Sequence, residues 1–207
     1  MEKPELLLIG GGGHCKSCID VIEQNGKYRV AGIVDVTENL HKKICGYENI
    51  ATDADLPKLA REYENFLISL GQITNPHKRI KLYHTLKGLN LKLPVITSPI
   101  AYVSKYAEIQ EGTIIMHHAL VNAGARVGRN CIINSKSLIE HDAIIGNHCH
   151  IATGAKINGG VTIGSGTFIG SNAVCIQNIE IGENLVIGCG KTIVKNISPN
   201  ALAKANP

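Results

Sequence analysis

The sequence predicts two domains, an α/β domain followed by a parallel β-helix. Two observations support this prediction. Apolar strand-like segments alternate with helical segments in the first half of the chain, and aliphatic residues recur every six positions in the second half. A period of six fits neither the turn of an α-helix nor the alternation of a β-strand, and it is typical of a parallel β-helix. We expect the first domain over residues 1–98 and the second over residues 99–207.

The first domain is expected to be Rossmann-like, with a small parallel sheet covered by helices. Strands are predicted at residues 6–9, 28–34 and 66–70, and helices at residues 16–24, 54–63 and 76–86. Alternation of this kind favours parallel strands, because each helix carries the chain back across the sheet.

A glycine-rich turn, Gly10-Gly11-Gly12-Gly13-His14, follows the first strand and opens the first helix. Backbone N–H groups at such a turn can face a phosphate. Asp35 ends the second strand, where an acid can bind a ribose or sugar hydroxyl. We therefore predict a nucleotide-linked ligand near Gly13, His14 and Asp35, and a tight turn without a ligand is the alternative. NAD is disfavoured because Cys15 stands where the third glycine of the dinucleotide fingerprint belongs.

The second domain is organised around one column of residues spaced six apart, all aliphatic except a single cysteine. The column is Val103, Ile109, Ile115, Val121, Val127, Ile133, Ile139, Ile145, Ile151, Ile157, Ile163, Ile169, Cys175, Ile181, Ile187 and Ile193. Three sides of about six residues would close a triangular coil of about eighteen, with this column pointing inward. About five coils would then stack at the strand spacing of about 4.8 Å.

The triplet Glu140-His141-Asp142 interrupts a series of small, neutral corner residues. An offset of about eighteen residues stacks His141 between Ala123 and Gly159, which leaves space that a ligand could fill. The two neighbouring carboxylates can orient one ring nitrogen and raise the basicity of the imidazole. We therefore predict that His141 is a general base, and a solvated charged corner is the alternative.

His150 lies nine positions after His141, half a coil away around the prism. The two histidines can meet only if a second subunit packs alongside, as the flat faces of β-helices in a cyclic trimer would allow. His148 is expected at the surface. His117 and His118 lack the further closely spaced histidines that a zinc site needs, so no metal is expected.

Composition narrows the classes of partner. The formal net charge of +4 suits phosphate-bearing small ligands, but no basic stripe with interleaved aromatics suggests a nucleic acid. No apolar run approaches the length of about 20 residues that a membrane span needs. The seven cysteines are an odd number without a metal-binding spacing, which favours free thiols and a cytoplasmic location.

The hexapeptide array resembles the left-handed β-helix acyltransferases. A narrower resemblance rests on the Gly-Gly-Gly-Gly-His loop together with Ile133-Asn134, the stretch Ser137-Leu138-Ile139-Glu140-His141-Asp142, and Ile145-Gly146. This combination resembles the bacterial nucleotide-sugar N-acetyltransferases of the PglD type and the sialic acid O-acetyltransferases called NeuD, over nearly the whole chain. The departures are Cys15, where the family usually has Gly or Ala, and Ala205-Asn206-Pro207, where a Gly-x-Pro ending is common.

The resemblance implies a homotrimer whose active site lies between neighbouring β-helices, with acetyl-CoA as co-substrate and no metal. The resemblance implies that His141 is the general base and that Asp142 orients it. It places Asn134 and Glu140 near the amino sugar, and Gly13, His14 and Asp35 in the nucleotide-sugar pocket. It also places His150 and Gly159 near the thioester, with the backbone N–H of Gly159 on the thioester carbonyl oxygen.

These features lead us to expect direct acetyl transfer from acetyl-CoA to a UDP-linked 4-amino sugar in bacterial glycan biosynthesis. The alternatives are O-acetylation of sialic acid or another nonulosonic acid, and N-acetylation of a GDP- or dTDP-linked amino sugar. A non-catalytic β-helix scaffold is the non-enzymatic alternative, but it would not need Glu140-His141-Asp142. A ping-pong route through Cys149 is disfavoured, because that column should face the packed interior.

Overall fold

The N-terminal domain is a five-stranded sheet in the computed structural model, which describes residues 3–199. The strand order is β3-β4-β2-β1-β5, with bounds β1 Glu5–Ile9, β2 Arg29–Val34, β3 Lys43–Ile44, β4 Tyr47–Ala51 and β5 Asn65–Ile68. The pairings are parallel except between β3 and β4, which form an antiparallel hairpin. The predicted parallel strands are confirmed, and the hairpin was not predicted.

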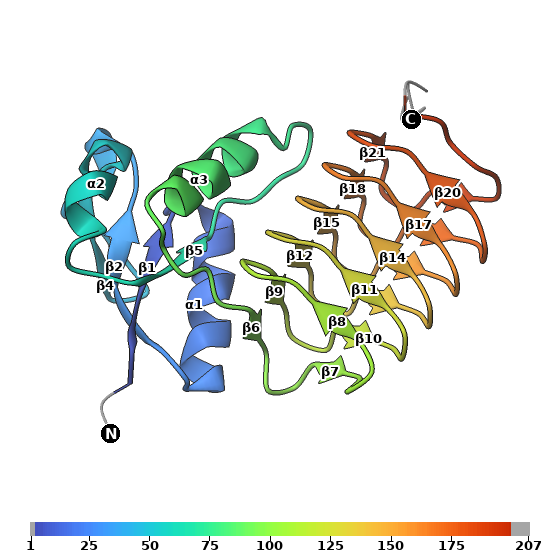
Figure 1. Ribbon diagram of the computed structural model, residues 1–207, viewed down its shortest axis with the longest axis horizontal. Coiled ribbons are helices and arrows are strands. Elements are labelled where there is room, and N and C mark those ends of the chain that lie inside the picture. The colour runs from blue at the N-terminus through green and yellow to red at the C-terminus, as the bar shows by residue number, and fades with distance from the viewer. Residues whose placement is uncertain (1–2, 200–207) are drawn as a thin grey trace.

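The sheet is covered by helices on both faces, because β1 buries apolar side chains alternately on each side. The helices are α1 Gly13–Asn25, α2 Leu56–Leu59 and α3 His77–Gly88, with the short 3-10 turns η1 Thr37–Asn39 and η2 Asp53–Asp55. Leu6 and Leu8 pack with α1, whereas Leu7 and Ile9 pack with α2 and α3. The α1 helix lies between the sheet and the β-helix (Figure 1).

The rest of the described chain is a β-helix of two-residue strands. Its strands are β6 Ile96–Thr97, β7 Tyr102–Val103, β8 Glu108–Ile109, β9 Ile114–Ile115, β10 Leu120–Val121, β11 Arg126–Val127, β12 Ile132–Ile133, β13 Leu138–Ile139, β14 Ile144–Ile145, β15 His150–Ile151, β16 Lys156–Ile157, β17 Thr162–Ile163, β18 Phe168–Ile169, β19 Val174–Cys175, β20 Glu180–Ile181, β21 Val186–Ile187 and β22 Thr192–Ile193. They form three parallel sheets, β22-β19-β16-β13-β10-β7, β20-β17-β14-β11-β8 and β21-β18-β15-β12-β9-β6 (Figure 1). The first strand, β6, already lies within the range expected for the N-terminal domain.

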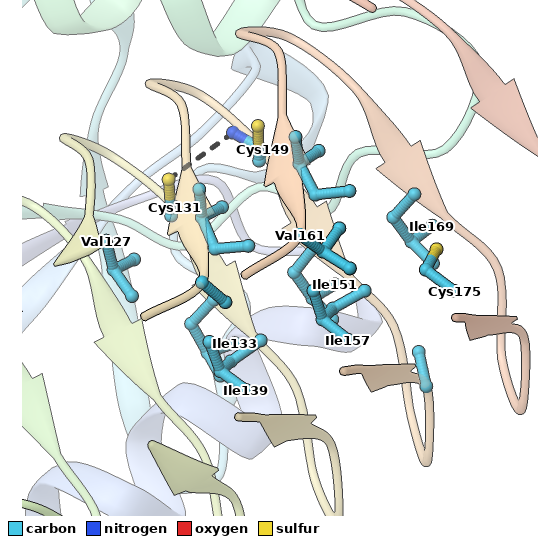
Figure 2. Packing of buried hydrophobic residues seen from close by; sticks show 14 of the residues in the cluster. Val127, Cys131, Ile133, Ile139, Cys149, Ile151, Ile157, Val161, Ile169 and Cys175 are labelled. Atoms are coloured by element: carbon cyan, nitrogen blue, oxygen red, sulfur yellow. Dashed lines mark hydrogen bonds between the residues drawn. The ribbon is translucent and has the colours of Figure 1, made fainter. Parts of the chain in front are cut away.

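The predicted stacking is confirmed residue by residue. Each strand pairs with the strand one coil away, as Val121 does with Ile139 and Ile139 with Ile157. The predicted column occupies the second position of strands β7 to β22 and forms the core of the β-helix. Figure 2 shows part of this column inside the coils, with Cys131 and Cys149 stacked beside it. The ending at residues 205–207 lies outside the described residues.

The corners between strands repeat one backbone conformation. Every sixth residue from 112 to 190 has a positive φ: Gly112, His118, Gly124, Asn130, Lys136, Asp142, His148, Gly154, Gly160, Gly166, Asn172, Asn178, Asn184 and Gly190. Glycine reaches this left-handed region without steric cost and asparagine with little, which explains why they dominate the column. Asp142 therefore occupies a position that is usually Gly or Asn in this chain.

Candidate active site

The triplet Glu140-His141-Asp142 forms the corner between β13 and β14, as the repeat predicts. The Nδ1 atom of His141 donates to Oδ2 of Asp142 at 2.9 Å, and the His141 side chain is 63% exposed. The hydrogen bond that His141 donates to Asp142 and the negative charges of Asp142 and Glu140 raise the pKa of His141. With Nδ1 engaged, Nε2 is the nitrogen that can accept a proton from a substrate.

The neighbouring coils fit around this corner. Nδ2 of Asn122 donates to Oε2 of Glu140 at 2.9 Å, and the same oxygen accepts the backbone N–H of His141 at 3.1 Å. On the other side, a Cβ atom added to Gly159 would lie 2.6 Å from Nε2 of His141. The imidazole therefore lies over Gly159, in the space that the missing side chain leaves.

A second group of predicted site residues meets at the domain interface. Nδ1 of His150 donates to the carbonyl oxygen of Gln72 at 2.5 Å, and Nδ2 of Asn134 donates to Nε2 of His150 at 3.1 Å. The His14 ring lies 6.4 Å from the His150 ring, centroid to centroid. Since β15, which carries His150, is in a different sheet from β13 and β14, one chain does not bring this group to His141.

Burial makes both interface histidines poor bases. It lowers the pKa of His14 to about 3 and that of His150 to about 4, and the positive charge of Arg79 acts in the same direction. The Nε2 atom of His14 is buried, with no hydrogen-bond partner among residues 3–199. Both rings are therefore neutral at pH 7.

Arg79 holds the two domains together from α3. Its buried guanidinium donates to the carbonyl oxygens of Ile68 and Leu70 at the end of β5, and to both the carbonyl and the side-chain oxygen of Asn130 in the β-helix. Burial lowers the pKa of Arg79 to about 10, which leaves it protonated at neutral pH. The sequence offered one signal of this role, a lone arginine among the apolar positions of a helix.

His148 is buried rather than exposed, so the sequence prediction for it was wrong. Its Nδ1 atom accepts from Nδ2 of Asn130 at 3.0 Å, and the Tyr83 ring meets its ring edge-on at 5.2 Å. The cause is α3, which covers this corner of the β-helix. A repeat pattern within the β-helix carries no information about what another domain covers.

The glycine-rich turn and Asp35 lie together at the carboxyl end of the sheet, as predicted. The α1 helix begins at Gly13, and a Cβ atom on Gly11 would lie 2.6 Å from Oδ2 of Asp35. The same oxygen accepts from Nδ2 of Asn39 at 2.7 Å. His14 follows Gly13 directly, but its side chain turns to the β-helix, where it meets His150.

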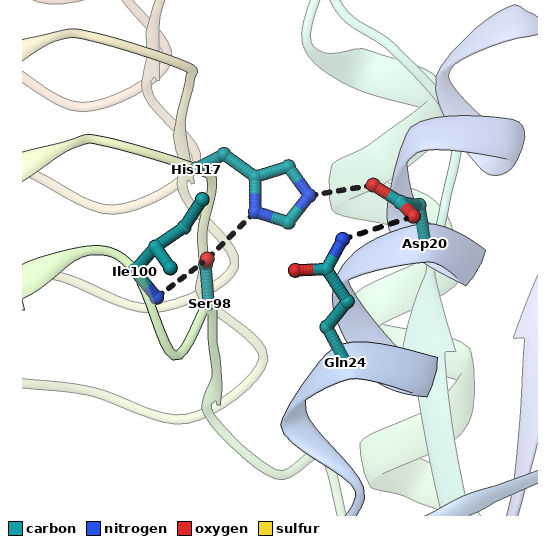
Figure 3. Close-up of polar contacts among 5 residues, drawn as sticks. All are labelled: Asp20, Gln24, Ser98, Ile100 and His117. Carbon is teal, nitrogen blue, oxygen red and sulfur yellow. Dashed lines mark hydrogen bonds and ion pairs between the residues drawn. The ribbon is translucent and has the colours of Figure 1, made fainter.

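A Ser-His-Asp chain also crosses the domain interface (Figure 3). The hydroxyl of Ser98 lies 2.7 Å from Nδ1 of His117, whose Nε2 lies 2.7 Å from Oδ2 of Asp20 on α1. Ser98 is only 1% exposed, so no substrate can reach its hydroxyl. The arrangement is a polar tether between domains and does not fit a nucleophilic serine.

Cys149 is fully buried in the β-helix, and burial raises the pKa of its thiol, which does not fit a thiolate nucleophile. Within residues 3–199, no cluster of three or more His, Cys, Asp or Glu could hold a metal ion. In the same described part of the chain, no helix combines the length and apolarity that a membrane crossing requires.

Two family models match the chain. The PglD N-terminal domain matches residues 5–86, and the bacterial transferase hexapeptide (six repeats) matches residues 142–177. A search of curated proteins gave no match.

Solved structures with the same fold include acetyltransferases. PerB from Caulobacter crescentus, in complex with CoA and GDP-perosamine, is 28% identical with a TM-score of 0.89, over 96% of this chain and 92% of that one. The acetyltransferase domain of PglB from Neisseria gonorrhoeae FA1090, in complex with acetyl coenzyme A, is 29% identical with a TM-score of 0.87, over 95% and 94%. WeeI from Acinetobacter baumannii AYE, at 20% identity and a TM-score of 0.83 over 96% and 95%, shares the fold. The chain is thus an acyltransferase with an α/β domain and a left-handed hexapeptide β-helix, and it resembles the PglD-type acetyltransferases over nearly its whole length.

Proposed function

We propose that this protein transfers the acetyl group of acetyl-CoA to the amine of a nucleotide-linked amino sugar. The observation that carries the proposal is the exposed His141–Asp142 pair, with Nε2 of His141 directed away from the carboxylate. The complexes of PerB with CoA and GDP-perosamine and of PglB with acetyl coenzyme A support the same two substrates here.

His141 acts as the general base. The sugar nitrogen attacks the acetyl carbonyl carbon, a C–N bond forms, and Nε2 of His141 removes the proton that the nitrogen must lose. Asp142 accepts from Nδ1 and stabilises the imidazolium that results. The C–S bond then breaks, and CoA leaves as a thiolate that needs little assistance.

The remaining predicted residues have supporting roles in this proposal. The backbone N–H of Gly159, next to the ring, donates to the oxyanion that forms on the acetyl group. Glu140 and Asn134 bind the sugar, Gly13, His14 and Asp35 hold its nucleotide, and His150 lies near the thioester. Direct transfer requires both substrates to be bound at once.

A homotrimer would complete the site. One chain leaves His141 exposed at a corner and places Asn134, His14 and His150 against a different sheet. A neighbouring β-helix beside the corner would exclude water and bring the two groups to one groove. The buried free thiols Cys15, Cys18 and Cys131 support a reducing, cytoplasmic location.

The proposal also concerns which nucleotide is attached to the amino sugar. A UDP-linked 4-amino sugar remains our prediction, and the complex of PerB with GDP-perosamine favours a GDP-linked amino sugar as the second candidate. The name of one relative, perosamine N-acetyltransferase from Caulobacter crescentus, favours transfer to nitrogen over O-acetylation of sialic acid. Thermal shift with UDP, GDP and dTDP separates the candidates, because a ligand that binds only the folded state raises Tm.

The test is a thiol-release assay with acetyl-CoA and a panel of UDP-, GDP- and dTDP-linked amino sugars and free sialic acid. We expect turnover with one nucleotide class, and His141→Ala should lower kcat by about 10²–10⁴ while CoA binding is retained. Structures of perosamine N-acetyltransferase variants with one histidine changed to asparagine or alanine contain CoA and GDP-perosamine. CoA binding by His141→Ala is therefore the control that the variant is folded and can bind its co-substrate. Near-normal turnover of His141→Ala would remove the proposed mechanism.

A further inference from the structure

The carboxylate of Asp142 lies directly against a glycine one coil away. Asp142 and Gly124 occupy the same corner column, with φ of 59° and 74°. The backbone N–H of Asp142 donates to the carbonyl oxygen of Ala123 at 3.2 Å, which fixes the spacing of the two coils. A Cβ atom added to Gly124 would lie only 2.4 Å from Oδ1 of Asp142.

This contact concerns the same carboxylate that binds the imidazole. Oδ2 of Asp142 accepts from Nδ1 of His141 at 2.9 Å, while Oδ1 occupies the space above Gly124. The two oxygens move together, because rotation about either side-chain torsion displaces both. A methyl group that pushes Oδ1 away therefore also moves Oδ2 off the imidazole.

We propose that Gly124 is a positioning residue for the reaction, because its missing side chain seats the Asp142 carboxylate that orients His141. The inference rests on the proposed function, in which His141 is the base. Asn122, two residues earlier, supports Glu140 of the same corner, so the coil containing Gly124 forms one side of the whole triplet.

The β-helix contains a matched control at another corner. Gly154 has a φ of 70°, and a Cβ atom there would lie 2.3 Å from Oδ1 of Asn172, one coil away. Alanine at Gly154 therefore meets a similar backbone strain and a similarly close side-chain oxygen, that of Asn172 in place of Asp142. It lies at a different corner and does not touch Asp142.

The experiment compares Gly124→Ala with Gly154→Ala. We expect both variants to lose similar amounts of Tm, and only Gly124→Ala to lose kcat, by tenfold or more and by no more than the full general-base contribution of about 10²–10⁴. We expect KM to change little. The pKa of His141, followed by NMR of its ring protons, should fall toward its ordinary value in Gly124→Ala alone, because the bond to Asp142 raises it. The acid limb of the pH–rate profile should shift to lower pH in step.

A double variant keeps the inference testable if Gly124→Ala folds poorly. Asp142→Gly removes the carboxylate and places glycine at a left-handed backbone position. The equivalent position one coil away is already a glycine, Gly160. In that background, Gly124→Ala should cause no further loss of kcat, because the residue acts only through Asp142. A further loss there, or a single Gly124→Ala variant with wild-type kcat and an unchanged pKa of His141, would overturn the inference.

The readouts also separate this inference from the proposed function. If the wild-type protein turns over none of the nucleotide-linked amino sugars, the proposed function fails. The NMR titration of His141 needs no substrate, so it still decides whether Gly124 seats the His141–Asp142 pair.

Discussion

Mild acid should weaken the fold at the domain interface, because buried histidines there must stay neutral. The structure lowers the pKa of His14 to about 3 and those of His148 and His150 to about 4. Burial is the largest cause for each, and the charge of Arg79 adds to it. The other groups that face these rings are the carbonyl oxygen of Gln72, the side chains of Asn130 and Asn134, and the rings of Tyr83, His84 and Phe168.

The sign follows from the direction of these shifts. A histidine with a lowered pKa in the folded state carries no penalty above the unfolded value of about 6.5, and stability is lost as the pH falls from there toward the folded value. Each bound proton changes the free energy of unfolding by about 1.4 kcal/mol per pH unit, so pH 5 costs about 2 kcal/mol per buried histidine. His14 and His150 together contribute about 4 kcal/mol, a large share of a typical stability of about 5–15 kcal/mol, and His148 acts in the same direction.

The assay is urea denaturation at pH 7.0, 6.5, 6.0, 5.5 and 5.0, at one protein concentration. Carboxylates titrate mostly below this range, so the slope reports histidines. The double variant His14→Asn, His150→Gln is the control. The slope of its free energy of unfolding against pH should correspond to about two fewer protons taken up on unfolding. His141, whose pKa is raised, acts with the opposite sign but is exposed. A free energy of unfolding that stays constant from pH 6.5 to 5.0 would show that these rings are not held neutral.

Two further predictions concern single contacts. Arg79→Met should lower the free energy of unfolding by about 3–5 kcal/mol, because the carbonyl oxygens of Ile68, Leu70 and Asn130 lose a buried donor. Urea denaturation measures this against Arg61→Met at an exposed position, and equal stabilities would contradict it. Gly159→Ala should lower kcat tenfold or more with little change in Tm, because its methyl group would lie 2.6 Å from Nε2 of an exposed ring that can swing away. Gly88→Ala, where an added Cβ meets nothing within 4 Å, is the control, and equal kcat values in both variants would refute the reasoning.

Sequence reasoning worked best where contacts repeat at a constant offset. It predicted that Ile139 pairs with Val121 and Ile157, and that Gly159 lies over His141. It also predicted the glycine-rich turn beside Asp35. It worked less well for short or irregular elements. The β3–β4 hairpin has only two residues in its first strand, and α2 spans only Leu56–Leu59 within the helix predicted at residues 54–63.

The α1 helix begins three residues before the predicted start, at Gly13. Glycine is a poor helix former, so local preference argued for a later start. The first turn is helical because His14 and Cys15 are anchored by tertiary contacts: His14 meets His150, and Cys15 is fully buried under the sheet. The same kind of contact buried His148, which the sequence placed at the surface.

The sequence by itself determined the β-helix, its register and the corner that carries His141 and Asp142. These contacts join residues a constant distance apart along the chain, so one aliphatic period specifies all of them. Only the tertiary structure decided how the two domains meet, through Arg79, His14 and His150, and which polar groups are neutral there. Such contacts depend on two separately folded surfaces fitting together, and no local pattern in either one encodes the desolvation that follows.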